Sequence, residues 1–386
     1  MKFTYANPTV IHFGPGKIAA IAKAIDPAAK VLVIYGGGSI KKNGVYDQVV
    51  AALEGRHWSE FSGVEPNPTV ETLNQAVDMI RKEGLDYVLA VGGGSVIDGS
   101  KYVAAAACYD GDGWDILSGK HTIAKALPLG AVLTLPATGS ESNSGGVITR
   151  QSTQTKLAFS SPFTFPRFAV LDPDVIKSLP ERQLANGLAD AFVHICEQYI
   201  TYPTQAWVQD GYAETLLRNL VNLALQFKER DNDTWRANFM WTANQALNGL
   251  IGAGVPQDWA THMIGHELTA AYGIDHARTL TIIQPAVLRE RIEDKKVKLA
   301  QMGRAVFGLA PDADLAQRTI SAIENLYRGL GLPVRLSEAG VGDALAPDHV
   351  KANIEKHAQM KPSLLKLGEK GEITPDVVRR IVAAAI

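Results

Sequence analysis

Short apolar runs alternate with amphipathic stretches through the first 180 residues of the chain. Five apolar runs predict strands, and they occupy residues 30–38, 57–64, 85–95, 127–142 and 168–173. Apolar residues at helical spacing predict helices over residues 44–55, 67–84 and 95–108. Strands that are apolar throughout and alternate with helices are typical of a parallel sheet covered on both faces.

The pattern changes in the second half of the chain. Residues 145–161 show β-like alternation on either side of a polar Gln-Ser-Thr-Gln-Thr segment, which predicts a hairpin. From about Leu179 onward the strand signals nearly vanish and helical spacing dominates. We therefore predict an α/β domain with a parallel sheet over residues 1–180 and an all-α domain over residues 181–386.

Composition and charge narrow the classes of protein. A length of 386 residues favours about two domains, and a net charge of −2 gives no reason to expect a nucleic acid or an anionic membrane as partner. Cys108 and Cys196 lie in apolar helical contexts, which predicts two buried reduced thiols. No signal-peptide core and no apolar run of about 20 residues is present, so we expect a cytoplasmic protein.

The tetrapeptide GGGS occurs twice, at residues 36–39 and 92–95, each time between an apolar strand and a helix. In a parallel sheet the carboxyl ends of the strands face the ligand crevice. Glycine lets the backbone approach a phosphate there, and a helix N-terminus offers free N–H donors. Two such loops predict a nucleotide site, although neither is a GxGxxG fingerprint. The alternative is two tight turns that bind no ligand.

The first loop indicates which nucleotide is bound. Gly37 and Gly38 stand where an NAD-binding chain places an acidic residue for the ribose hydroxyls. Ser39 and Lys41, followed by Lys42, offer a hydroxyl and two cations for an additional phosphate. This favours NADP(H) over NAD. The alternative is that these lysines are solvated surface residues.

Three of the nine histidines fall within residues 262–276 of a mostly apolar segment. His262 and His266 are four residues apart and share one face of a helix, and Gly273 can end that helix before His276. A histidine on an apolar face is usually a core residue with a satisfied hydrogen bond. Glu267 and Asp275 are possible partners for such bonds.

A second apolar stretch changes the interpretation of these histidines. Asp190 and His194 are also four residues apart on an apolar helix. One carboxylate and three or four imidazoles on two apolar helices predict a divalent metal site, and burying Asp190 without a cation would carry a large penalty. The ligand types suit iron(II) and zinc alike, and a free coordination position suits catalysis.

Motifs along the whole chain resemble those of the iron-containing (group III) alcohol dehydrogenase family, in the family's order. They are PTxIxFGxG at residues 8–16, GGGSxxDxxK at 92–101, LPATGSE at 135–141, DAxxHxxE at 190–197, and HxxxH at 262–266 followed by His276. YGGGSIKK at residues 35–42 and the segment 247–270 resemble the bacterial NADPH-dependent aldehyde reductases and butanol dehydrogenases most closely.

The resemblance assigns roles by motif position. The implied metal ligands are Asp190, His194, His262 and His276, and the implied catalytic residues are His266, a non-ligand proton relay near the substrate, and Asp98. The residues matching cofactor contacts are Gly93, Gly94, Ser95, Asp98, Thr134, Thr138, Ser140 and Lys156. Iron and zinc both occur in the family. Many members follow the last ligand with glycine, whereas this chain has Ala277.

The resemblance also implies a Rossmann-like, dehydroquinate-synthase-like fold, a homodimer, and a cofactor cleft between domains. The expected reaction is reversible NADPH-dependent reduction of small aldehydes to primary alcohols, by hydride transfer to a metal-polarised carbonyl. The rivals are a glycerol-dehydrogenase-like polyol dehydrogenase, a dehydroquinate-synthase-like lyase, and a non-enzyme that binds a nucleotide or a metal. The ligands have apolar flanks, at residues 188–195 and 260–273, which favour small uncharged substrates.

Overall fold

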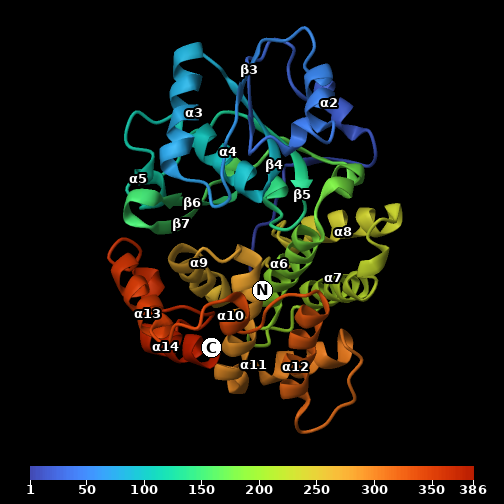
Figure 1. Ribbon diagram of the computed structural model, residues 1–386, viewed down its shortest axis with the longest axis vertical. Helices are drawn as coiled ribbons and strands as arrows, with labels where there is room; N and C mark the ends of the chain where they lie inside the picture. Colours follow the sequence, from blue (N-terminus) through green and yellow to red (C-terminus); the bar gives the residue numbers. More distant parts are fainter. The chain divides into compact units, whose positions relative to one another are not determined.

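The computed structural model describes residues 1–386, which form two compact units (Figure 1). One unit comprises Ala6–Pro180 and Arg230–Asn244, and the other comprises Met1–Tyr5, Glu181–Glu229 and Gln245–Ile386. The first contains every strand, and the second is helical. The expected fold class, a parallel α/β part followed by a helical part, is confirmed. Arg230–Asn244 belongs to the α/β unit although it follows helices of the other unit in sequence.

Six parallel strands form the sheet of the α/β unit in the order β1-β8-β5-β4-β2-β3. Their bounds are β1 (Val10–Phe13), β2 (Val31–Tyr35), β3 (Trp58–Phe61), β4 (Tyr87–Gly93), β5 (Leu129–Leu135) and β8 (Phe168–Leu171). The five predicted strands are all present. The edge strand β1 was not predicted, because it has four residues and Val10 is exposed, so it lacks the continuous apolar run of a buried strand.

The predicted hairpin is confirmed. Strands β6 (Gly145–Arg150) and β7 (Thr155–Ser160) pair antiparallel, with Arg150 opposite Thr155 at the turn. A parallel bridge between Thr69 and Thr149 ties the hairpin to the start of α3 (Val70–Glu83). Thr69 also caps that helix, because its hydroxyl accepts a hydrogen bond from the Thr72 amide.

Alternate residues of the central strands point to opposite sides of the sheet. Val31 and Val33 of β2 share a core with residues of α1 (Ile21–Ala24) and α2 (Val45–Ala52). On β4 and β5 packs α4 (Gly94–Ala106), which also contacts α3. This unit also contains the short α5 (Trp114–Leu117) and most of α8 (Asp233–Ala246). Both faces of the sheet are therefore buried, which explains why its strands are apolar throughout.

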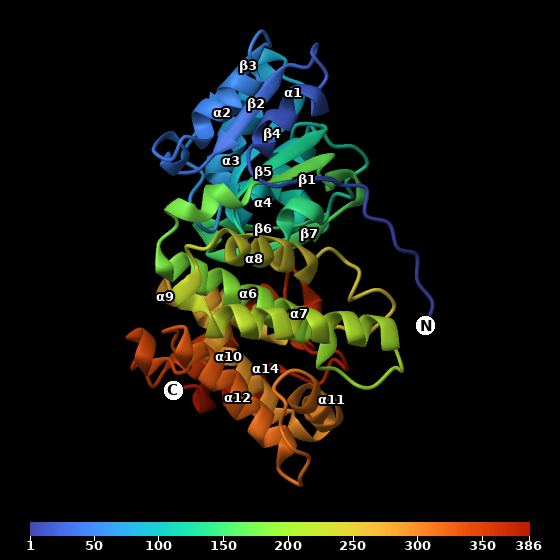
Figure 2. The same cartoon turned by 90° about the vertical axis from the view of Figure 1, so that its right-hand side faces the viewer.

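The helical unit is built around α6, whose residues are almost all buried from Leu184 to Tyr199. Its helices are α6 (Glu181–Tyr199), α7 (Trp207–Leu225), α9 (Ala260–Tyr272), α10 (His276–Glu290), α11 (Ile292–Ala305), α12 (Leu315–Gly329), α13 (Ala346–His357) and α14 (Pro375–Ala384). Figure 2 shows α7 running alongside α6, against which it packs. No helix is both long and apolar enough to cross a membrane.

We predict opposite effects for two glycine-to-alanine changes. A Cβ at Gly130, in β5, would lie 2.4 Å from the Phe168 ring, so Gly130→Ala should lower the free energy of unfolding by about 1–3 kcal/mol. Gly211, inside α7, has no atom within 4 Å of such a Cβ, so Gly211→Ala should raise stability by about 0.5–1 kcal/mol. Urea unfolding of the full chain measures both. Equal stability of the two variants would contradict this packing.

Candidate functional site

Three helices carry the predicted metal ligands inside the helical unit. Asp190 and His194 lie one turn apart on α6, and His262 lies on α9. Gly273 ends α9 with a φ of 66°, and α10 then begins at His276, as the sequence predicted. All these ligands belong to one compact unit, so the packing of its helices defines their arrangement.

The Asp190 carboxylate is the common neighbour of the imidazoles. Its Oδ1 atom lies 3.4 Å from His194 Nδ1, 3.7 Å from His262 Nε2 and 3.8 Å from His276 Nε2. For metal–ligand bonds of about 2.1 Å, the edge of a tetrahedron is about 3.4 Å. The observed separations are therefore close to those of ligands around one small divalent ion.

Three buried atoms in this cluster have no hydrogen-bond partner: Asp190 Oδ1, His194 Nδ1 and His262 Nε2. They are also the kinds of atom that bind a metal, and the ligand atoms of these residues lie within 4.8 Å of one another. An unsatisfied buried polar atom costs about 1–3 kcal/mol, and more when it is charged. One cation at their centre would satisfy all three, so the residues present fit a bound metal.

The protonation states of the metal-free cluster follow from the same contacts. Burial alone would raise the pKa of Asp190, but the surrounding imidazoles, His194 first among them, hold it well below its usual range. Burial lowers the pKa of His194 to about 4, which leaves the neutral ring that a metal requires. Burial also opposes the charge on His262, yet the Glu197 carboxylate raises its pKa to about 9.

Glu197 orients His262. Its Oε2 atom bonds His262 Nδ1, and its Oε1 atom accepts the Thr261 amide at 2.7 Å. This leaves His262 Nε2 directed at Asp190, an arrangement that commonly fixes the tautomer and raises the basicity of a ligating histidine. Sequence reasoning placed Glu197 in a motif without a role. Its position three residues after His194, on the same face of α6, was the available signal.

His266 lies beside the cluster and is buried. Its ring centroid is 6.3 Å from that of His262 and 5.2 Å from that of His276. The carboxylates considered as alternative partners of these histidines bind elsewhere: Glu267 pairs with His357 at 3.0 Å, and Asp275 accepts hydrogen bonds from Arg182 and Asn186.

In the α/β unit, the two glycine loops differ in why they contain glycine. A Cβ at Gly92 would lie 2.5 Å from Val96, and one at Gly94 would lie 2.5 Å from Thr138, so packing requires both glycines. Gly93 and Gly94 also stand at the N-terminus of α4, where free N–H groups favour an anion. By contrast, a Cβ at Gly37 would meet nothing within 4 Å. Packing therefore does not require glycine at position 37, and the space beside its Cα atom is open.

The first loop continues into a 3₁₀ turn, Ser39–Lys41, and Gly38 precedes it with a φ of 87°. The Lys41 ammonium lies 3.2 Å from Glu60 and 4.5 Å from the centre of the Tyr46 ring. Tyr46 in turn donates a hydrogen bond to Glu60 at 2.6 Å. Lys41 is therefore a partly exposed cation that already has a carboxylate partner, and a phosphate would compete for it.

Asp98 and Ser140, both predicted cofactor contacts, are bonded to each other. Ser140 donates to Asp98 Oδ1 at 2.5 Å, and the Val147 amide donates to Asp98 Oδ2 at 2.9 Å. Burial raises the pKa of Asp98. Thr134 and Thr138 are half-buried in β5 and the loop after it, and Ser95 is half-buried in the first turn of α4. Lys156 of β7 donates to Asn67 at 2.8 Å.

Lys101 is a residue of this region to which sequence reasoning assigned no role. It is fully buried on α4, and its ammonium donates to Ser140 Oγ at 2.9 Å, Asn143 Oδ1 at 2.9 Å and the Gly145 carbonyl at 2.7 Å. Burial lowers its pKa to about 8. All three bonds go to residues 140–145, which lead from β5 into the first residue of β6, so Lys101 holds this stretch against α4.

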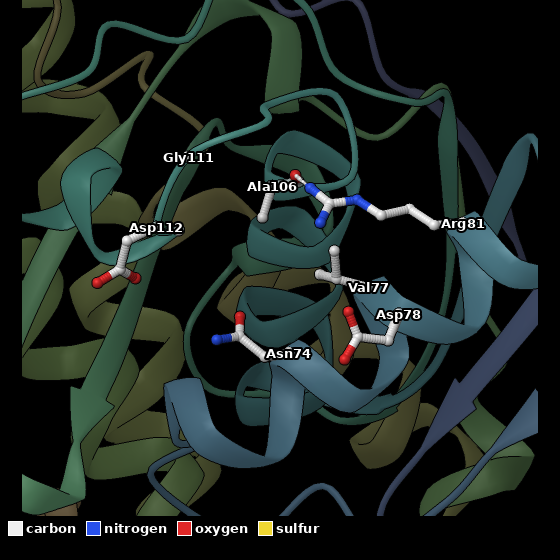
Figure 3. Close-up of a pocket in the computed structure, with 8 residues that line it drawn as sticks. Asn74, Val77, Asp78, Arg81, Ala106, Gly111 and Asp112 are labelled. Carbon is white, nitrogen blue, oxygen red and sulfur yellow. Dashed lines mark hydrogen bonds between the residues drawn. The ribbon is translucent and has the colours of Figure 1, made fainter.

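Figure 3 shows a separate cavity of about 160 Å³ in the α/β unit. It is lined by Asn74, Val77, Asp78, Arg81, Ala106, Gly111, Asp112 and Gly113. Arg81 extends from α3 toward α4 and donates to the carbonyls of Ala106 and Tyr109. None of the predicted site residues lines this cavity, so it is distinct from both the metal cluster and the glycine loops.

We predict that Glu197→Gln weakens Zn²⁺ binding by about 10- to 100-fold, because the neutral amide no longer supports the basicity of His262. Glu267→Gln is the matched control, since Glu267 is also a buried carboxylate bonded to a histidine, but that histidine is His357. The affinity of Glu267→Gln for Zn²⁺ should stay within about twofold of that of the unchanged protein. Competition with a chromophoric chelator measures both, and equal losses in the two variants would contradict the role of Glu197.

Comparison with known proteins agrees with this geometry. Residues 8–173 match the model of iron-containing alcohol dehydrogenase, and residues 184–368 match the C-terminal model of the same family. The chain is 50% identical over 390 residues to the NADPH-dependent aldehyde reductase YqhD of Escherichia coli (strain K12), covering 100% of this chain and 99% of that protein.

Two further comparisons extend the match. NADH-dependent butanol dehydrogenase A of Clostridium acetobutylicum is 39% identical over 350 residues, which cover 89% of this chain and 90% of that protein. The crystal structure of E. coli K-12 YqhD matches with a TM-score of 0.96 at 48% identity, covering 100% of this chain and 99% of the other. The resemblance in the motifs is thus confirmed, and the chain belongs to the iron-containing alcohol dehydrogenase family.

Proposed function

We propose that the chain reduces small aldehydes to primary alcohols with NADPH and one divalent metal ion, and that it also catalyses the reverse reaction. The observation that supports this most directly is the convergence of three buried, unpartnered ligand atoms from Asp190, His194 and His262. The relative from E. coli, at 50% identity over the full chain, is named an NADPH-dependent aldehyde reductase.

The metal would be held by Asp190, His194, His262 and His276. When bound, iron(II) or zinc polarises the substrate carbonyl as a Lewis acid, and NADPH supplies the hydride. The low pKa of Asp190 keeps its carboxylate ionised, and the low pKa of His194 keeps its ring neutral, so both are ready to bind a cation at neutral pH. Glu197 keeps His262 in the tautomer that directs Nε2 toward the ion.

The α/β unit would bind the nucleotide. The first amides of α4, at Gly93, Gly94 and Ser95, are placed to donate to a pyrophosphate. Thr134 and Thr138 would line the nicotinamide together with Asp98, which Ser140 and the Val147 amide hold in place. Lys156 would bind the nicotinamide ribose, and Lys41 the additional phosphate of NADPH, on exchanging their present partners Asn67 and Glu60.

His266 is the proposed proton donor to the product oxygen. It is buried on α9, one turn after His262, and its ring lies next to that of His276. The role is supported by this position beside the ring of His276. A positioned acid of this kind supplies the proton that converts the developing alkoxide into the alcohol.

The apolar segment around His262 belongs to the core of the helical unit. Ile264 and Leu268, in the apolar segment that follows His262, pack in the core of the helical unit. Their apolar character is thus explained by packing and says little about the substrate. The preference for small aldehydes is supported instead by the names of the relatives, which are an aldehyde reductase and butanol dehydrogenases.

We propose the domain roles, the homodimer and the cytoplasmic location that the sequence analysis predicts. The α/β unit serves as the dinucleotide-binding domain and the helical unit as the metal-binding catalytic domain. A homodimer is supported by the edge strand β1, whose outer edge pairs with no strand of this chain. A cytoplasmic location is supported by two free cysteines, Cys108 and Cys196, which form no disulfide.

The test of this function removes single ligands. We predict that Asp190→Ala and His276→Ala each lose bound metal, and that each loses at least about 100-fold in NADPH-dependent reduction of butanal, because the carbonyl is no longer polarised. His349→Ala is the control, since His349 is an exposed histidine of the same unit and should retain both properties. Metal analysis beside an NADPH absorbance assay measures them. Full turnover by metal-stripped protein would disprove the mechanism.

Cofactor choice is tested at position 37. We predict that Gly37→Asp raises the KM for NADPH by about tenfold or more and changes the KM for NADH less. A carboxylate at this position repels the additional phosphate of NADPH and can accept hydrogen bonds from the ribose hydroxyls of NADH. The side chain has room, since no atom lies within 4 Å of a Cβ at this position. Gly37→Asn adds the same bulk without the charge and is the control. Comparable turnover of NADH and NADPH by the unchanged protein would contradict the NADP assignment.

A further inference from the structure

Two lysines of α11 are buried in the helical unit. Lys295 is 1% exposed and Lys298 is 3% exposed. Lysine is almost never fully buried unless its charge is paired, so each must serve a particular partner. Their partners differ, although they stand one turn apart on the same helix.

Lys295 joins three separate segments of the chain. Its ammonium lies 2.8 Å from Asp258 Oδ2 and 2.9 Å from both carboxylate oxygens of Glu369, and it donates to the Ile200 carbonyl at 2.9 Å. The side chains of Asp258 and Glu369 are also buried. The Lys295 ammonium therefore connects Ile200 at the end of α6, Asp258 in the loop before α9 and Glu369 in the loop before α14.

Asp258 connects this cation to the first turn of α9. Its Oδ1 atom accepts the Ala260 amide at 3.0 Å and so satisfies the first free amide of the helix, two residues before His262. Its own amide donates to the Glu197 carbonyl at 2.8 Å. Trp259, between Asp258 and Ala260, adopts a left-handed conformation with a φ of 62°. A residue other than glycine keeps this conformation only when its surroundings impose it.

The segment that Asp258 holds also contacts the metal ligands. The Trp259 ring centroid lies 5.4 Å from that of His262 and 6.0 Å from that of His194. Displacement of Asp258 would therefore release the first amide of α9 and the left-handed turn together. Either change moves His262 relative to Asp190, which lies on a different helix.

We propose that Lys295 is a positioning residue of the metal centre: through Asp258 it holds the first turn of α9, and so holds His262 at its place beside Asp190 and His194. This inference rests on the proposed metal site. It assigns to Lys295 no contact with metal, substrate or cofactor.

The test compares the two lysines. Lys298 pairs with Asp210 of α7 at 2.6 Å and lies 4.1 Å from the centre of the Tyr199 ring, so its contacts do not include α9. Lys295→Met and Lys298→Met should both lower the urea midpoint of the full chain, because each leaves a carboxylate without its buried partner. Only Lys295→Met should also weaken Zn²⁺ binding, by about tenfold or more in chelator competition.

Two further variants test whether Lys295 affects Zn²⁺ binding through Asp258. Glu369→Gln leaves the Lys295–Asp258 pair intact, so it should lower stability and keep the affinity for Zn²⁺. Asp258→Asn should weaken Zn²⁺ binding like Lys295→Met, and the double variant should bind no more weakly than either single one, because both act through the same contact. Should Lys295→Met fail to fold, Asp258→Asn against Glu369→Gln makes the same comparison.

The outcomes separate this inference from the function it depends on. If the unchanged protein binds no Zn²⁺ in the competition assay, the proposed metal centre itself is wrong. If the unchanged protein binds Zn²⁺ and Lys295→Met or Asp258→Asn binds it equally well, the metal centre stands and the positioning role is wrong. Equal loss of affinity in Lys298→Met would also overturn it, because the effect would then be a general consequence of lost stability.

Discussion

The Asp190 carboxylate sets the main physical constraint on the helical unit. It is buried on α6, and its Oδ1 atom faces imidazole nitrogens without accepting a hydrogen bond from any of them. Such a group is costly unless a positive charge lies beside it. His194 Nδ1 and His262 Nε2, next to it, are unpartnered as well, so one cation would satisfy all three atoms.

The cluster depends on residues that lie outside it. Glu197 bonds His262 and accepts a hydrogen bond from the amide of Thr261, while Asp258 donates to the Glu197 carbonyl and accepts the first amide of α9. Lys295 neutralises Asp258. A series of buried polar contacts thus extends from α11 to the predicted metal ligands. Buried networks of this kind are stable when every member is satisfied, and they constrain geometry for the same reason.

The α/β unit uses a buried lysine in a similar way. Lys101 gives its three donors to the segment that carries Ser140, and Ser140 in turn bonds Asp98. The glycines of the two loops have different physical origins. Gly92 and Gly94 allow close packing against Val96 and Thr138, whereas Gly37 leaves space that no side chain of the protein fills. Packing alone thus explains the second loop better than the first.

Local periodicity was sufficient to identify most helices and strands. It also identified which site residues share a face of the same helix. The spacing of four between Asp190 and His194, and between His262 and His266, placed each pair on one face, because 3.6 residues per turn is a property of any helix. The same rule could not show the partners of Lys41, Lys101, Lys295 or Glu267. The hydrogen bonds of these four residues join positions 19 to 95 apart in the sequence. Only the packing of helices and strands in three dimensions decides them, because a buried charge takes whichever partner the fold brings within reach.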